Sequence, residues 1–141
     1  EKAFSELRRA DHFKRLRIYY PDHQVPDPLA FIVVHSKLMI VDNIFITIGS
    51  ANLNHRSMRV DNELNLSFEA KDERTHHFIS LILYRLLAEH LDTSVTNLKE
   101  TFESQGIGET IQCFKDRNER TLTDIPKTKL NPLEKMLRIS T

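Results

Sequence analysis

The sequence has few of the features that mark secreted, membrane-spanning or nucleic-acid-binding chains. It holds one cysteine in 141 residues, which excludes an internal disulfide framework and fits a reducing compartment. Lysine and arginine number 20, and so do aspartate and glutamate, so no overall electric field favours a nucleic-acid partner. No run of about 18 apolar residues, the length that a transmembrane helix needs, occurs in this stretch.

The length fits a single domain over residues 1–141 that can bury a core. No signal peptide is visible, but the chain begins at Glu1 rather than methionine. We therefore interpret it as a piece of a longer protein, whose own targeting signals this stretch does not report. A cytoplasmic or membrane-associated location is expected.

Polar and titratable side chains interrupt a series of apolar, strand-like runs between residues 31 and 69. Burying such groups is costly unless they are paired or used in a site. Either this core holds many satisfied polar groups or the stretch forms a functional site. The candidate site residues are His35, Lys37, Asp42, Ser50, Asn52 and Glu63.

The spacing of His35 and Lys37 predicts that both side chains point to one face of a strand. An imidazole and an ammonium on one face, beside hydroxyl and amide donors, form a receptor for a phosphate oxyanion. A neutral imidazole can attack phosphorus or move a proton, and a carboxylate on its other ring nitrogen would fix its tautomer. No Cys/His or acidic cluster would obviously hold a metal. The sequence therefore predicts metal-free attack on a phosphodiester, without a cofactor.

These residues also carry a family resemblance. His35-Ser36-Lys37, then Asp42, then the run 49–52 (Gly-Ser-Ala-Asn) resembles the HxKx4D…GSxN signature of the phospholipase D superfamily, the HKD family. The segments 54–65 and 83–91 extend the resemblance to bacterial phospholipase D-like proteins. The chain thus resembles the C-terminal half of such a protein.

The resemblance implies a role for each matching residue. His35 would form a phosphohistidine intermediate or act as its acid/base partner, and Glu63 would orient it. Asp42 matches the aspartate of the motif, with a role that looks more structural than chemical. The phosphate-binding residues would be Lys37, Ser50 and Asn52. His55 follows the GSxN loop closely and is a candidate substrate contact.

The function that the resemblance implies is a phospholipase D-type phosphodiesterase. It would hydrolyse or transfer the phosphatidyl group of a phospholipid at a membrane surface. Family sites use two HxK motifs, and we count one in this chain, at His35-Ser36-Lys37. We therefore expect it to be inactive alone and to need a second HKD half, from the same parent chain or from a homodimer. The alternatives are a cardiolipin-synthase-like phosphatidyltransferase, an HKD nuclease, and a non-catalytic phosphate- or membrane-binding module.

The fold expected is α/β. Apolar β-branched runs predict the strands, and apolar residues at helical spacing predict the helices. The strands are expected at 16–20, 31–41, 44–49 and 63–68, and the helices at 2–14, 72–91, 94–105 and 107–114. A surface tail is expected over 117–141. The resemblance implies a phospholipase D-like α/β sandwich that is one half of a pseudo-twofold pair.

A basic cluster near the start of the chain has two interpretations. It forms either a solvated helix face or a surface that attracts anionic lipid headgroups. Its members are Arg8, Arg9, Lys14, Arg15 and Arg17.

Overall fold

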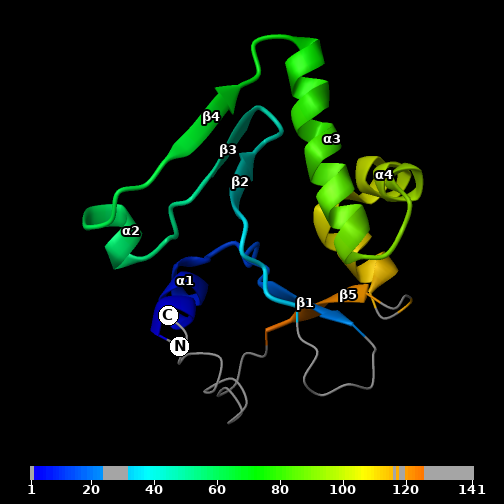
Figure 1. Ribbon diagram of the computed structural model, residues 1–141. Coiled ribbons are helices and arrows are strands. Elements are labelled where there is room, and N and C mark those ends of the chain that lie inside the picture. Colours follow the sequence, from blue (N-terminus) through cyan, green and yellow to red (C-terminus); the bar gives the residue numbers. More distant parts are fainter. Residues whose placement is uncertain (1, 24–31, 116, 118–119, 126–141) are drawn as a thin grey trace.

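The computed structural model describes residues 2–23, 32–115, 117 and 120–125 (Figure 1). The elements within these residues are α1 (Lys2–Ala10), β1 (Tyr19–His23), β2 (Lys37–Val41), β3 (Phe45–Gly49), α2 (His55–Arg59), β4 (Asn65–Glu69), α3 (Glu73–His90), α4 (Val95–Phe114) and β5 (Arg120–Asp124). This mixture of helices and strands agrees with the predicted α/β class. No helix in the described residues is long and apolar enough to cross a membrane.

The two long helices begin at side-chain caps. Asp72 precedes α3, and its carboxylate accepts a hydrogen bond from the Thr75 amide at 2.7 Å. Ser94 caps α4 in the same way, accepting from the Asn97 amide at 3.1 Å. Gly106 has a φ of 80° and kinks α4, which confirms the predicted break between helices at this residue.

Strands β2, β3 and β4 form an antiparallel sheet in that order. The turn between β2 and β3 holds Asp42 and Asn43 at φ values of 51° and 57°, which these two residue types tolerate well. Residues that face each other across paired strands point to the same side of a sheet. One side of this sheet is therefore wholly apolar: Leu38, Ile40, Ile46, Ile48, Leu66 and Phe68.

The main core lies elsewhere, between α3, α4 and the antiparallel pair β1–β5. Its buried residues are Tyr84, Ala88, Leu91, Leu98, Ile111 and Leu122. The Tyr84 and Phe102 rings meet edge to face with centroids 5.2 Å apart. In Figure 1 the three-stranded sheet extends away from this core, and of the six residues on its apolar side only Ile46 is buried.

The prediction of a surface tail from residue 117 is wrong for residues 120–125. This segment forms β5, pairs with β1 from Tyr19↔Asp124 to His23↔Arg120, and buries Thr121 and Leu122. The pairing joins residues about a hundred positions apart, so no local pattern announces it. Residues 126–141 lie outside the described part.

Several predicted boundaries also differ from the structure. The strand expected at 16–20 is β1, which begins at Tyr19, and the helix expected at 2–14 ends at Ala10. The strand expected at 31–41 begins only at Lys37, because residues 32–36 belong to no helix or strand; Phe31 lies outside the described residues. Strand β4 begins two residues later than expected, and helix α2 was not predicted.

Candidate functional site

The loop after β3 is joined to the segment that leads into β4. The Ser50 amide donates to the Leu64 carbonyl at 3.0 Å, and the Leu64 amide donates to Ser50 Oγ at 3.0 Å. Ser50 Oγ in turn donates to Glu63 Oε2 at 2.5 Å. The Ala51 amide donates to Asn65 Oδ1 at 3.3 Å. These bonds hold the GSxN loop against Glu63, as strand pairing of β3 with β4 requires.

Gly49 allows this close approach. A Cβ at residue 49 would lie 1.9 Å from Asn65 Oδ1 and 2.3 Å from the Leu64 carbonyl oxygen. Only a residue without a side chain fits beneath Asn65. Asn65 is therefore a site-forming residue that the motif analysis did not single out. The only signal in the sequence was its place at the end of the segment 54–65.

Glu63 is a stabilised carboxylate. Its pKa lies below the ordinary value of 4.5, mainly because the Ser50 hydroxyl donates to it and next because the Ser57 hydroxyl does. Desolvation raises this pKa in part, and the positive charges of Lys37 and Arg56 lower it by smaller amounts. Glu63 is therefore ionised at neutral pH, with Lys37 close enough to feel its charge.

His35 and Lys37 lie at the entrance to β2. Lys37 is the first residue of the strand, and its ammonium donates to the His35 carbonyl at 2.6 Å. The His35 side chain is exposed. Among the described residues, no hydrogen bond joins its imidazole to Glu63. The predicted orienting contact thus stays a prediction, and the Glu63 carboxylate still has lone pairs to accept it.

The other predicted site residues lie at different distances from this group. Asn52 is exposed in the loop two residues after Ser50, and His55 is the exposed first residue of α2. Asp42 lies at the β2–β3 turn, five residues from Lys37 and so roughly 16 Å away at the rise of a strand. The position of Asp42 fits a structural role, because its side chain cannot reach His35 or Lys37 at the other end of the strand.

The bare His-x-Lys spacing also occurs at His12-Phe13-Lys14, which the motif analysis did not count. This copy lacks both the aspartate five residues after the lysine and a GSxN loop. The structure places it in the turn after α1 rather than at the start of a paired strand. It therefore does not reproduce the arrangement around Lys37.

The arrangement can bind an oxyanion from one side. Lys37 supplies a positive charge, and His35 supplies an exposed imidazole two residues away. Ser50 has one hydroxyl proton and gives it to Glu63, so donation to a phosphate would require the hydroxyl to turn away from Glu63. Within residues 2–23, 32–115, 117 and 120–125, no group of three or more His, Cys, Asp or Glu side chains is placed to hold a metal.

Comparisons with known proteins agree with the motif. A family model described as "Cardiolipin synthase, PLD-like domain" matches residues 2–82. Phospholipase D alpha 4 of Arabidopsis thaliana is 39% identical over 67 residues, which cover 46% of this chain and 9% of that protein. Phospholipase D A of Dictyostelium discoideum is 52% identical over 42 residues, or 30% of this chain and 3% of that protein.

The matches span less than a tenth of the length of these curated relatives. No solved structure matches the chain. The family model, however, covers more than half of the sequence and includes the whole site from His35 to Glu63. The chain therefore belongs to the phospholipase D superfamily, within its PLD-like domain family.

Proposed function

We propose that this chain forms one half of the active site of a phospholipase D-type phosphodiesterase that acts on the phosphatidyl group of a phospholipid. The observation that carries the proposal is the grouping of Lys37, Ser50 and Glu63 beside an exposed His35, at the paired ends of β2, β3 and β4. A structural cluster of this kind would have its histidine buried and hydrogen-bonded. Here the imidazole stands open to a substrate.

In the proposed first step, one imidazole nitrogen of a neutral histidine attacks phosphorus and forms a P–N bond. The bond between phosphorus and the headgroup oxygen breaks, and that oxygen takes a proton from a second histidine on the opposite side. Water or an alcohol then attacks the phosphohistidine, gives its proton to the same second histidine, and releases the phosphatidyl group. Lys37 and Asn52 stabilise the equatorial oxygens in both steps.

The second histidine is proposed to come from a second HKD half, in the parent chain or in another copy of this chain. The apolar side of the sheet, opposite to the side of Lys37, supports a packing partner as well. Ile48, Leu66 and Phe68 are 46%, 57% and 55% exposed although they lie on one continuous face. An apolar face of this kind usually marks a contact surface. We include in this proposal that the two HKD halves form an α/β sandwich in which a pseudo-twofold axis relates one half to the other.

Phosphatidyl transfer is the second candidate. It is favoured by the description of the matching family model, which names cardiolipin synthase. The two activities differ only in the acceptor of the phosphatidyl group in the second step. The acceptor is water for the hydrolase and the hydroxyl group of a second phosphatidylglycerol for the transferase. Product analysis with phosphatidylglycerol vesicles distinguishes them, because only the transferase makes cardiolipin.

The test compares His35→Asn with His12→Asn. Both histidines are exposed and both precede a lysine by two residues, but only His35 belongs to the complete motif. We expect His35→Asn to lower the hydrolysis of bis-p-nitrophenyl phosphate and the release of headgroups from vesicles by about 10³-fold or more. We expect His12→Asn to retain the rate.

The assay is run at protein concentrations at which the chain self-associates, or with a second HKD half present, and circular dichroism checks the fold of each variant. A His35→Asn rate close to that of the unmodified chain would rule out the assignment. Phosphate binding without any turnover would leave the non-catalytic binding module as the function.

A further inference from the structure

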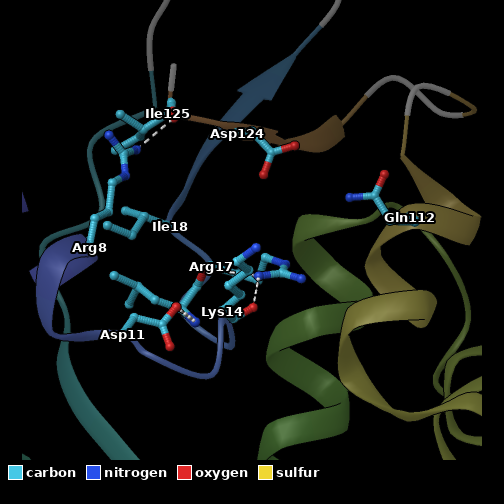
Figure 2. A pocket seen from close by; sticks show the side chains of 9 residues that line it. Arg8, Asp11, Lys14, Arg17, Ile18, Gln112, Asp124 and Ile125 are labelled. Carbon is cyan, nitrogen blue, oxygen red and sulfur yellow. Dashed lines mark hydrogen bonds between the residues drawn. The ribbon is translucent and has the colours of Figure 1, made fainter. Parts of the chain in front are cut away.

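A separate cavity lies between α1, the turn that follows it and the end of β5 (Figure 2). Its volume is about 710 Å³, and none of its lining residues belongs to the set assigned to phosphodiester chemistry. A volume in this range suits a small organic ligand better than a bare ion. We propose that this cavity binds a phosphomonoester of a small organic molecule, apart from the His35 site.

Three cationic side chains line the cavity: Arg8, Lys14 and Arg17. The Arg8 guanidinium donates to the Ile125 carbonyl at 3.0 Å, which fixes it at the rim. Arg17 Nη1 donates to the carbonyls of Lys14 and Leu16 at 2.8 and 3.1 Å. Both of these bonds use one nitrogen, so Nε and Nη2 of Arg17 keep their donors. The held guanidinium of Arg17 can therefore present two parallel donors to phosphate oxygens.

Two carboxylates also line the cavity, and each is already engaged. Asp11 accepts from the Arg15 and Leu16 amides at 2.9 and 2.8 Å. Asp124 forms an ion pair with Lys115 at 2.9 Å. The Lys14 ammonium, by contrast, has no ion pair in the described part of the chain. Asp11 keeps its negative charge beside Arg17, and the further positive charge of Lys14 leaves this part of the cavity cationic, which favours an anionic ligand.

The apolar residues of the cavity lining indicate which class of anion the cavity would bind. Leu16, Ile18 and Ile125 line the same cavity and are partly buried. Inorganic phosphate would leave this apolar surface exposed to water, whereas the carbon part of an organic phosphate would bury it. Gln112 adds one neutral donor and acceptor on the side of α4 (Figure 2). The lining therefore matches a charged group joined to a small carbon skeleton.

This cavity gives the basic cluster a more specific role than a solvated helix face. Three of its five arginines and lysines line the cavity, while Arg9 and Arg15 do not. The Arg15 guanidinium instead lies over the Phe13 ring, 4.9 Å from its centroid. Arg15 therefore offers a matched control: the same segment and charge, outside the cavity.

The experiment measures glycerol 3-phosphate binding by calorimetry, with glycerol and inorganic phosphate as comparison probes. The cavity variant is Lys14→Gln/Arg17→Gln. It spares the Arg8–Ile125 bond, and its fold is checked by thermal melting. We expect binding of glycerol 3-phosphate but not glycerol, and a loss of about tenfold or more in the cavity variant, equal to about 1.4 kcal/mol. Arg15→Gln should stay within about twofold, because salt screens distant charges.

Lys37→Gln separates this cavity from the phosphodiester site: it removes any glycerol 3-phosphate binding at Lys37 and should leave the binding that the cavity variant loses. Flotation with phosphatidylcholine vesicles, with and without phosphatidate, shows whether the phosphomonoester comes from a lipid headgroup or a free metabolite. The proposal is overturned if glycerol 3-phosphate does not bind or binds no better than inorganic phosphate. It is also overturned if Arg15→Gln or Lys37→Gln weakens binding as much as the cavity variant does.

Discussion

The Ser50 hydroxyl and the Glu63 carboxylate meet at 2.5 Å, and this contact places the GSxN loop beside the start of β4. Ser50 also accepts from the Leu64 amide, so its oxygen has one donor and one acceptor partner. A hydroxyl in this arrangement acts first as a positioning group. Its proposed donation to phosphate then depends on how readily it leaves Glu63.

The first prediction concerns Glu63→Gln. The amide oxygen of glutamine can still accept from Ser50, but the negative charge near Lys37 and Arg56 is lost. We expect the rate to fall by about 10²-fold, through misplacement rather than loss of a reacting group, and so by less than in His35→Asn. Steady-state kinetics on bis-p-nitrophenyl phosphate measures both variants.

The pH dependence of stability gives this prediction a second readout. The pKa of Glu63 is lowered in the folded chain, mainly by the Ser50 hydroxyl. The ionised carboxylate therefore stabilises the fold at pH values above 4.5, the ordinary pKa of a glutamate. This contribution is lost as the pH falls through the lower folded value. Urea unfolding between neutral and acid pH should show a smaller loss for Glu63→Gln than for the unmodified chain. An identical pH profile would contradict the contact.

The second prediction concerns the glycines. Gly49→Ala places a Cβ against Asn65 and the Leu64 backbone, so β4 must shift. We expect a loss of about 1–3 kcal/mol in the free energy of unfolding. Gly108→Ala is the matched control, because its Cβ meets nothing within 4 Å and the residue lies in α4. That variant should gain about 0.5–1 kcal/mol from helix propensity.

Gly106→Ala tests the effect of backbone conformation separately from the effect of a steric clash at the added Cβ. Its Cβ also meets nothing within 4 Å, but φ is 80°. We expect it to lose about 1–3 kcal/mol through backbone strain alone. Urea unfolding followed by circular dichroism measures all three variants. If Gly49→Ala and Gly108→Ala behave alike, the close approach of Asn65 to Gly49 is not present in solution.

The features that could be predicted from the sequence depend on neighbouring residues. The caps of Asp72 and Ser94 act within three residues, and the turn at Asp42–Asn43 follows from the tolerance of these residues for positive φ. The break at Gly106 is local in the same sense. These caps, this turn and this break can therefore be predicted from the sequence without any knowledge of tertiary contacts.

The features that could not be predicted depend on pairing between distant residues. Strand β5 exists because Thr121 and Leu122 are buried beside β1, about a hundred residues earlier in the chain. The packing of Asn65 over Gly49 follows from the register of β3 and β4, which the motif spacing does not state. The motif assigns Ser50 and Glu63 to one site, but it does not predict that the Ser50 hydroxyl donates to Glu63.

The third prediction is that the chemical step does not need a divalent metal. Lys37 carries a fixed positive charge and Asn52 offers amide donors, and these groups are proposed to stabilise the phosphate oxygens. Excess EDTA should leave the hydrolysis of bis-p-nitrophenyl phosphate, a soluble monomeric ester, unchanged. Complete loss of that activity in EDTA would contradict the prediction. Vesicle assays do not serve here, because metals also alter lipid surfaces.

The last prediction is that an isolated monomer of this chain is close to inactive. In-line displacement needs one histidine to attack phosphorus and another to protonate the leaving oxygen from the opposite side. A single imidazole cannot occupy both positions. His12 precedes a lysine but lies in the turn after α1, while His76, His77 and His90 belong to α3. None of these completes a second motif. A second copy or half would supply the missing histidine on the Lys37 side of the sheet, which is the side opposite to the apolar face.

The check is to weigh residues 1–141 by light scattering across a dilution series and to assay the same samples. If two copies form the site, the rate per chain should fall in parallel with the dimer fraction. Adding an excess of His35→Asn chains should then inhibit, since mixed pairs contain one imidazole where two are needed. If the second half comes from elsewhere, every dilution should be inactive until that half is added. A strictly monomeric sample with ordinary turnover would contradict the two-histidine mechanism, because its only motif histidine would be acting from both sides of phosphorus.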